Sequence, residues 1–246
     1  MSGHSKWSTI KRQKEVTDKA KGKLFSKLAK AIGIAIKTGG GIDPETNSKL
    51  RVAIDTARMA NMPKANIERI LSKGAEIGDL QEVTYEGFGP EGIAVIVEST
   101  TDNRNRTGQE IKGIFERAGG HLAGRGAVSF NYEPRGLVLV KKSDKVEEQM
   151  LKLIDLGAEE IEDTADGIEI FVPPELLGQF KEKLLASGFG IVSSELTQKP
   201  KNYLSIENGL KAAKVLSFLD TLSEHDDVQK VFANVDIPQD ILAKIS

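Results

Sequence analysis

The apolar residues of this 246-residue chain change their spacing near Gly78, and this change limits most strongly what the chain can fold into. Before Gly78 they recur every three or four residues, which is the period of an amphipathic helix. After it, short runs rich in β-branched residues alternate with helical stretches, as in sheets covered by helices. The sequence therefore predicts an α+β protein that begins with helices alone.

Three helices are predicted between residues 22 and 77. The first carries apolar residues at helical spacing from Leu24 to Ile36 and stops at three consecutive glycines, 39–41. Leu50 to Ala57 provide a second apolar stripe. Pro63 opens the third helix, because proline suits the first turn of a helix. We expect the three helices to form a small bundle, since none can bury its stripe alone.

A complete β-α-β-β-α-β series occupies residues 136–196. Strand-like runs at its two ends enclose two helical stretches and a hairpin around Asp166-Gly167. A glycine ends each helical stretch, as is common at helix C-termini. This order of elements predicts a ferredoxin-like fold, in which two helices cover one face of a four-stranded sheet.

A second series starts at Ile93 but stops halfway. It has a strand at its beginning, a helix that Asp102 would cap, and two short strands around a glycine turn at 124–126. A helix at 206–222 and a strand at 228–235 would supply the missing half. The prediction is therefore an N-terminal three-helix domain followed by two ferredoxin-like α/β domains, one inserted into the other. Its parts are a basic arm at 1–21, a helical domain at 22–77, a discontinuous middle domain at 78–134 plus 202–246, and an inserted domain at 135–201.

Composition excludes several classes of protein. Cysteine is absent, which removes disulfides, thiolate catalysis and cysteine-bound metals. The longest unbroken apolar run, Ile93 to Val97, is far shorter than the roughly 20 residues that a membrane helix needs. No apolar stretch follows the first positive charges, so no secretory signal is predicted. We expect a cytoplasmic protein, and the sequence gives no indication of its oligomeric state.

Charge is unevenly distributed along the chain. Residues 1–73 hold 16 Lys and Arg against 6 Asp and Glu, a net charge of +10, whereas the remainder carries −12. Nine of the cations fall within the first thirty residues. Phosphates would relieve the repulsion among them, and release of counterions would drive the association. The pattern predicts a nucleic-acid partner; the alternative is a solubilising tail.

Two smaller features could support such binding. Trp7, the only tryptophan, lies inside the basic run and could either stack on a base or pack against the helices. Arg104 and Arg106, with Arg125 on the nearby glycine turn, could bind phosphate through their guanidinium groups. A capped helix start with a structural ion pair would explain the same arginines. The residues leave both choices open.

Several enzyme-like patterns match by letters only. Gly87 to Gly92 fit G-x-G-x-x-G, but they precede a strand instead of opening a helix, so we predict a turn and no nucleotide site. The three histidines lie in separate segments, which disfavours a zinc site. Four carboxylates could hold a divalent ion for phosphodiester cleavage, although solvated strand ends and a helix cap explain them more simply. These carboxylates belong to Glu86, Glu91, Glu98 and Asp102. The sequence predicts no catalytic residue, no metal and no cofactor, and a metal-dependent nuclease is the weaker alternative.

Four segments resemble the YebC/PmpR family, which includes the mitochondrial translational activator of cytochrome c oxidase. They are GHSKW at 3–7, DPETNSKLRVAIDTARMANMPKANIERIL at 43–71, YEGFGPEGIAVIVE at 85–98 and TDNRNRT at 101–107. The resemblance is strong from residue 1 to about residue 135. His121 and Ala123 depart from it, because members usually have an asparagine and a glycine there.

This resemblance implies a non-enzymatic regulator with one helical and two α/β domains. Members are described as DNA-binding transcriptional regulators, which is the function we expect here. Others act on the ribosome and help translation through difficult sequences such as proline runs, so a factor that binds ribosomal RNA is the alternative. The resemblance indicates His4, Lys6, Trp7, Lys11 and Arg12 as direct nucleic-acid contacts. The full predicted set adds Lys14, Lys19, Lys21, Lys23, Lys49, Arg51, Arg58, Lys64, Arg104, Arg106 and Arg125.

Overall fold

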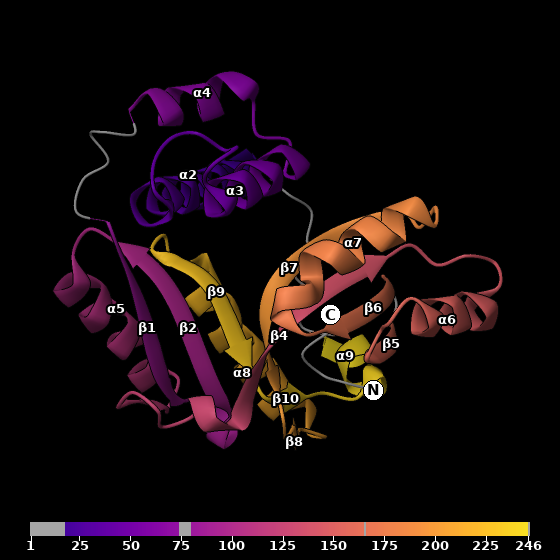
Figure 1. The fold of residues 1–246 in the computed structure, drawn as a ribbon. Coiled ribbons are helices and arrows are strands. Elements are labelled where there is room, and N and C mark those ends of the chain that lie inside the picture. Colours follow the sequence, from indigo (N-terminus) through magenta and orange to yellow (C-terminus); the bar gives the residue numbers. More distant parts are fainter. Residues whose placement is uncertain (1–17, 74–79, 165, 246) are drawn as a thin grey trace. The chain divides into compact units, whose positions relative to one another are not determined.

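The computed structural model describes residues 18–73, 80–164 and 166–245 (Figure 1). Their elements form two compact units. The described residues of the first unit lie within Glu15–Ala127 and Lys214–Val231, and those of the second within Val128–Ala213 and Phe232–Ser246. Helices come first and antiparallel sheets follow, so the predicted α+β class is confirmed. The four-part division of the chain stays a prediction.

Three helices open the first unit. They are α2 (Asp18–Gly39), α3 (Ser48–Met59) and α4 (Lys64–Ser72), as the apolar spacing predicts. Their stripes meet in one core, in which Ile32 and Leu50 are completely buried. The core consists of Leu28, Ile32, Ala35, Ile36, Leu50, Ile54, Ala57, Met62 and Ile67.

The loop between α2 and α3 is organised by the buried amide of Asn47. Its Nδ2 donates to the carbonyls of Ala35 at 2.9 Å and Gly41 at 2.7 Å, and its Oδ1 accepts from the amide of Leu50 at 2.9 Å, which caps α3. A Cβ on Gly39 would lie 2.0 Å from Oδ1 of Asn47. The first of the three glycines is therefore needed for a close approach, whereas Gly40 and Gly41 have the positive φ that follows the helix.

The first unit also contains a four-stranded sheet. Its strands are β1 (Gln81–Phe88), β2 (Ala94–Thr101), β3 (His121–Ala123) and β9 (Val228–Ala233), in the order β3-β1-β2-β9. The helices α5 (Arg104–Arg117) and α8 (Gly209–Glu224) meet through Phe115 and Phe218, whose rings are edge-to-face with centroids 5.0 Å apart. Both rings are buried, so the two helices share a core.

The chain order within this sheet differs from the prediction. The predicted first strand, β2, is preceded by β1, and only one of the two strands predicted between 121 and 133 forms before the strand that begins at Tyr132. Residues after β3 instead make a turn and the 3-10 helix η2 (Ser129–Asn131). The position between β2 and β3 is taken by β1, which pairs with both. The ferredoxin-like strand order is thus kept, but one central strand comes from earlier in the chain.

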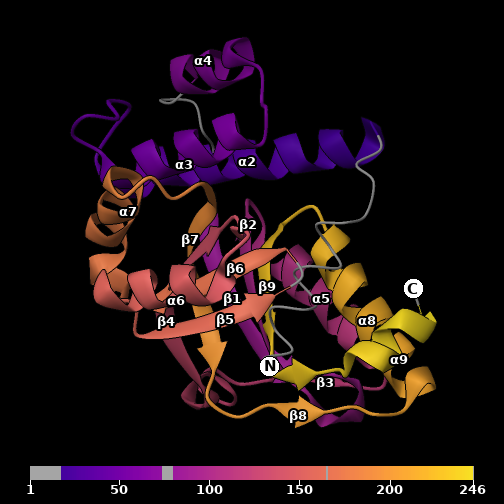
Figure 2. The same cartoon turned by 90° about the vertical axis from the view of Figure 1, so that its right-hand side faces the viewer.

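The second unit contains the other predicted sheet. It runs through β4 (Tyr132–Val140), α6 (Val146–Asp155), β5 (Glu160–Thr164), β6 (Gly167–Val172), η3 (Pro174–Leu176), α7 (Leu177–Ala186) and β7 (Ile191–Pro200). The strand order is β5-β6-β4-β7 with every pair antiparallel, which confirms the ferredoxin-like prediction. Both helices lie on one face of the sheet (Figure 2), where Leu153, Phe180 and Leu184 pack against strand residues.

Smaller differences concern the later elements. The second unit adds a parallel pair, β8 (Leu204–Ser205) with β10 (Val235–Asp236), and a short helix α9 (Gln239–Ile245), none of which was expected. In α8 Ala212 is buried and Ala213 is exposed. On α6, Leu153 is buried, whereas Ile154 is 55% exposed. None of the described helices is long and apolar enough to cross a membrane.

Candidate nucleic-acid interface

The predicted contacts fall into three groups. Six of them lie outside the described residues, as does the side chain of Lys19: His4, Lys6, Trp7, Lys11, Arg12 and Lys14. Their roles stay predictions, and so does the choice between stacking and packing for Trp7. A second group lies on the helical bundle, and a third lies around α5.

The residues of the second group are exposed. Lys49, Arg51 and Arg58 lie on α3, Lys64 lies on α4, and Lys21 lies on α2. Arg51 and Arg58 are seven residues apart and therefore share a face of α3. Arg58 is 3.6 Å from Asp55, and Lys64 on α4 is 3.5 Å from Glu68, with all four side chains about half exposed or more. The attraction within an exposed ion pair is weak, so a phosphate could replace the carboxylate as the partner of the cation. Lys49 is also exposed and donates to Thr38 Oγ1 at the long distance of 3.5 Å.

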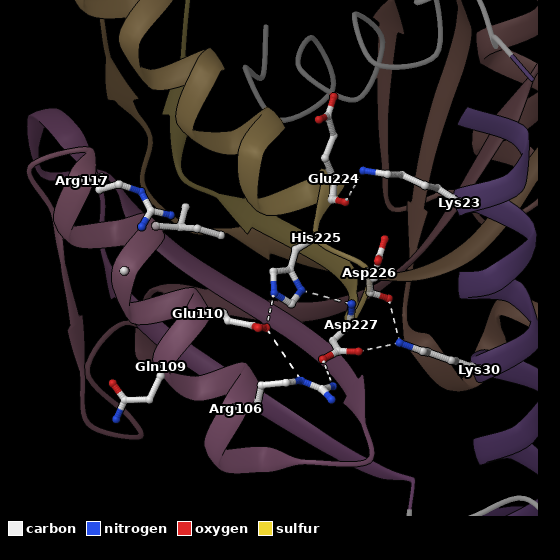
Figure 3. A pocket seen from close by; sticks show the side chains of 12 residues that line it. Lys23, Lys30, Arg106, Gln109, Glu110, Arg117, Glu224, His225, Asp226 and Asp227 are labelled. Carbon is white, nitrogen blue, oxygen red and sulfur yellow. Dashed lines mark hydrogen bonds and ion pairs between the residues drawn. The ribbon is translucent and has the colours of Figure 1, made fainter. Parts of the chain in front are cut away.

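Lys23 has a hydrogen-bond partner within the protein, and its role as a nucleic-acid contact stays a prediction. Its Nζ donates to the carbonyl of Glu224 at 3.3 Å, at the end of α8. Two more lysines of α2 do the same: Lys27 donates to the carbonyl of Ser223 at 2.5 Å, and Lys30 to that of Asp226 at 3.1 Å. The carbonyls of Ser223 and Glu224 lie at the negative end of the α8 dipole, which attracts cations, and that of Asp226 follows two residues after the helix. Figure 3 shows Lys23 and Lys30 reaching from α2 toward the segment between α8 and β9.

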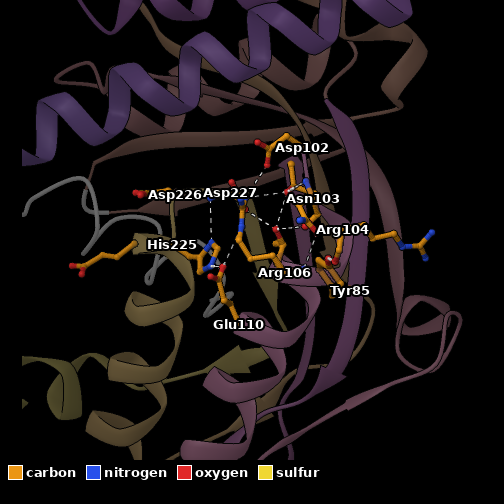
Figure 4. A network of polar contacts seen from close by, with 12 residues as sticks. Tyr85, Asp102, Asn103, Arg104, Arg106, Glu110, His225, Asp226 and Asp227 are labelled. Carbon is orange, nitrogen blue, oxygen red and sulfur yellow. Dashed lines mark hydrogen bonds and ion pairs between the residues drawn. The ribbon is translucent and has the colours of Figure 1, made fainter. Parts of the chain in front are cut away.

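Asp227 is the centre of the contacts in this segment. Its Oδ1 accepts from Lys30 at 2.5 Å, and its Oδ2 accepts from Thr107 Oγ1 at 2.6 Å and Arg106 Nη2 at 2.8 Å (Figure 4). The side chain is only 5% exposed. Burial alone would raise the pKa of Asp227, but the hydrogen bonds from Lys30, Thr107 and Arg106 outweigh it and hold that pKa well below its usual range. The carboxylate therefore stays ionised at neutral pH and binds both cations.

The TDNRNRT segment builds the other side of this network. Asn103, and not the predicted Asp102, caps α5, because its Oδ1 accepts from the amide of Arg106 at 3.0 Å. The amide of Asn103 in turn donates to Thr101 Oγ1 at 2.9 Å. Asp102 instead accepts from the guanidinium of Arg106 at 2.9 Å. For Arg106, the structural ion pair is thus the explanation that the structure supports, and its pKa is raised by the hydrogen bond to Asp227.

Arg104 and Arg125 remain candidates for phosphate contact. Both are exposed, and Figure 4 shows Arg104 pointing away from the network around Asp227. Arg125 lies on a turn that is fixed by Glu86, whose carboxylate is buried and accepts from the amide of Gly126 at 2.8 Å. The predicted turn at Gly87 to Gly92 also forms: it consists of the end of β1, Gly89 and the 3-10 helix η1 (Pro90–Gly92), and β2 begins two residues later.

Carboxylates and histidine around Asp227 could be mistaken for a metal site. Among the described residues, one group of such side chains lies close enough to hold an ion: Glu110, His225 and Asp227. However, both oxygens of Asp227 already accept hydrogen bonds from cations, and His225 Nδ1 accepts from the amide of Asp227 at 3.1 Å. His225 Nε2 then donates to Glu110 at 2.9 Å. The atoms that could bind a metal are thus already used in hydrogen bonds. Glu110, His225 and Asp227 line a pocket of about 680 Å³, whose other lining residues include both lysines and acidic side chains.

Sequence reasoning misses the residues that make this network. Lys27 and Lys30 belong to the basic run, but nothing distinguishes them from its other cations. Asp227 lies 120 residues from Thr107, so no local pattern links the two. The one pattern that could have revealed the network is the TDNRNRT segment. Its threonines and asparagines suit helix capping as well as they suit phosphate binding.

The fold and its charges define a class of protein: an all-helical basic domain followed by two antiparallel sheets with helices. A solved structure has the same architecture. It is that of a conserved hypothetical protein from Aquifex aeolicus, which is 41% identical, superposes with a TM-score of 0.84, and covers 94% of this chain and 99% of its own.

The chain belongs to the TACO1/YebC family. The model of the family's N-terminal domain matches residues 5–77, and that of its second and third domain matches residues 80–235. A relative from Dictyoglomus turgidum is 46% identical over 251 residues, covering all of both chains. One from Thermotoga petrophila is 45% identical over 243 residues, covering 96% of this chain and 94% of its own. Each is named a probable transcriptional regulatory protein. The family resemblance seen in the sequence is thereby confirmed, and the chain is a regulator of the YebC type.

Proposed function

We propose that this regulator is a non-enzymatic, DNA-binding protein of the cytoplasm that acts on transcription through its N-terminal domain. The observation that carries the proposal is the excess of cations in residues 1–73, a net charge of +10 on a chain whose remainder is acidic. Such a separation of charge orients the protein toward a polyanion and speeds the encounter. The names of the relatives support a role in transcription.

The described cations of α3 and α4 suit contacts with phosphate. Arg51, Arg58 and Lys64 are exposed, and among the described residues the last two pair with surface carboxylates. A guanidinium can bind a phosphate through two parallel hydrogen bonds, which is stronger than a screened surface pair. Arg51 and Arg58 on one face of α3 would therefore follow a sugar-phosphate backbone without reading its sequence.

The loop between α2 and α3 favours a second candidate function. Residues 40–47 join these helices, whereas a helix-turn-helix uses a turn of three or four residues. The two helices therefore lack the helix-turn-helix geometry that places a recognition helix in the major groove. Irregular RNA is bound through phosphates and exposed bases instead. The second candidate is thus a ribosome-associated factor that binds ribosomal RNA and relieves stalls at sequences such as proline runs.

A binding experiment tests the shared part of both functions. Fluorescence anisotropy with a labelled 20-base-pair DNA duplex and a labelled 20-nucleotide RNA would be measured over a series of salt concentrations. If Arg51 and Arg58 each meet a phosphate, changing both to glutamine should reduce the slope of log K against log salt by about 1.8 on the duplex. Lys141→Gln with Lys152→Gln is the matched control, because it removes two exposed cations from the second unit and should leave the slope unchanged.

Two outcomes decide the matter. A protein that binds neither oligonucleotide nor purified ribosomes at low salt, where attraction is greatest, would contradict both candidates. If it binds, crosslinking in cells followed by sequencing of the bound nucleic acid separates them, because a transcriptional regulator is recovered on DNA and a translation factor on ribosomal RNA.

A further inference from the structure

One face of α2 carries a continuous row of lysines. Lys23, Lys27, Lys30, Ile34 and Lys37 follow one another at intervals of three or four residues, so their side chains leave the helix on the same side. The apolar residues that pack against α3 and α4 lie on the opposite side of α2. We call these five residues the lysine row. This helix therefore has two contact faces of different chemistry.

The lysine row contacts segments that flank the four-stranded sheet of the first unit, namely the end of α8, the residues between α8 and β9, and Leu80 before β1. Lys23 and Lys27 donate to carbonyls of the last two residues of α8, and Lys30 donates to the carbonyl of Asp226 and to the carboxylate of Asp227, both just after that helix. Lys37 donates to the carbonyl of Leu80, one residue before β1, at 3.2 Å. Ile34 is buried, yet it does not belong to the core of the three helices. Four lysines of the row thus contact this part of the first unit, and Ile34 is the row's one apolar member.

A contact made in this way is sensitive to competing anions. Apolar burial stabilises a contact at any salt concentration, whereas attraction between charged groups near the surface is screened by ions. The hydrogen bonds of Lys23 and Lys37 are exposed, and the side chain of Lys30 is 28% exposed. Phosphate oxygens offer these ammonium groups the same kind of acceptor as the carbonyls, with a full negative charge added.

We propose that the lysine row is a second phosphate-binding surface, which the end of α8 covers and which a nucleic acid uncovers by competing for the same ammonium groups. The proposal rests on the proposed function and adds a regulated part to its site. Lys23, Lys27 and Lys30 span about 10 Å along the helix at a rise of 1.5 Å per residue. Successive phosphates of one strand are spaced about 3.4 Å apart along a duplex, so this span covers about three phosphate intervals and each lysine can reach a phosphate.

Asp227 makes the exchange possible at low cost. If Lys30 leaves it, the carboxylate keeps its hydrogen bonds from Arg106 and Thr107, so no buried charge is left without a partner. The amide of Thr100 also continues to donate to the carbonyl of Asp227 at 2.8 Å, which keeps this residue fixed to the end of β2. The covered and uncovered states therefore differ in α2 and not in the sheet. By linkage, whatever weakens the contact of α2 strengthens nucleic-acid binding by the same factor.

A distance measurement tests the proposal on the full chain. Because the chain has no cysteine, Ser26→Cys on α2 and Ser217→Cys on α8 would provide the only two sites for spin labels, and both positions are exposed. Pulsed electron-electron resonance would compare the free protein with the protein saturated by the 20-nucleotide RNA or the 20-base-pair DNA. We expect a single short distance in the free protein and a second, longer one when the oligonucleotide is bound.

The outcomes separate this proposal from the proposed function. If anisotropy shows binding but the label distance does not change, the lysine row stays covered and the present proposal is overturned while nucleic-acid binding stands. If no oligonucleotide binds at low salt, the proposed function fails and this proposal fails with it.

A pair of substitutions tests the linkage independently. Asp227→Asn removes the carboxylate that Lys30 holds, whereas Asp226→Asn makes the same change of charge one residue away, where only the backbone carbonyl contacts Lys30. Asp227→Asn should steepen the salt slope by about 0.7 on RNA for each lysine that it frees, and Asp226→Asn should not. Equal slopes for the two variants would contradict the proposal. Should Asp227→Asn fail to fold, the label distance in the otherwise unchanged protein still decides.

Discussion

The hydroxyl of Thr107 offers the sharpest test of the network around Asp227. Thr107 is completely buried, and its Oγ1 lies 2.6 Å from Asp227 Oδ2 and 2.8 Å from Thr101 Oγ1. A hydroxyl has one hydrogen, and the charged acceptor takes it, so Thr107 accepts from Thr101. Thr107→Val keeps the shape of the side chain and replaces the hydroxyl with a methyl group, which cannot form hydrogen bonds. It deletes one hydrogen bond to a charge and leaves a buried hydroxyl, that of Thr101, without this acceptor.

These two losses set the magnitude. A hydrogen bond to a charged group contributes about 1.5–3 kcal/mol, and a buried polar group that loses its partner costs about 1–3 kcal/mol. Since Asp227 keeps Lys30 and Arg106, we expect Thr107→Val to lower the free energy of unfolding by about 2–4 kcal/mol. Urea denaturation would measure this as a lower midpoint at an unchanged slope.

Thr56→Val is the matched control for this measurement. Thr56 lies on α3, is exposed, and donates to the carbonyl of Val52 four residues earlier, so its loss should change stability by no more than about 0.5 kcal/mol. If Thr107→Val destabilises the protein no more than this control does, Asp227 does not organise the unit in the way described here.

Two further outcomes are expected. Asn47→Ala should lower the free energy of unfolding by about 2–3 kcal/mol in urea denaturation, because the cap of α3 is lost and two carbonyls lose their donor, whereas the exposed Asn105→Ala should have little effect. Acid should also destabilise the protein through Asp227: its pKa is depressed in the folded state, so its contribution is complete above its ordinary value of 3.8 and is lost as the pH falls below it. Urea denaturation between pH 7 and pH 2 should therefore show a smaller acid loss for Asp227→Asn than for the unchanged protein; parallel curves would exclude Asp227 as the cause.

Local patterns predict most of the helices and the second sheet of this protein. The apolar stripe from Leu24 to Ile36, the proline at 63 and the hairpin at Asp166-Gly167 each specify an element without help from distant residues. The ferredoxin-like unit at 132–200 is one continuous stretch, so its order of elements is also its topology. Periodicity and turn chemistry are sufficient there.

The four-stranded sheet of the first unit and the network around Asp227 depend on residues far apart in the sequence, so the sequence predicts them less well. The strand β1 carries a buried glutamate, Glu86, and a glycine, Gly87, which obscure its alternation. Cβ placement shows why the glycine is there: a side chain at Gly87 would lie 2.5 Å from the carbonyl of His121. Likewise, charge alone marks Lys23 as a nucleic-acid contact, whereas its acceptor at Glu224 becomes visible only in the folded chain.

The late arrival of β9 has a consequence for how the chain folds as it is synthesised. Seven of the eight residues of β2 are buried, yet β9, its neighbour on one side, begins at Val228, more than a hundred residues further on. During synthesis the earlier half of the sheet emerges with an unprotected apolar edge, the kind of edge that invites pairing with other chains. The residues 132–200 that emerge in between form a sheet of their own and can fold meanwhile. A nascent chain halted before residue 228 should therefore be prone to aggregate, because the six residues of β9 complete a sheet that begins with β1 at Gln81.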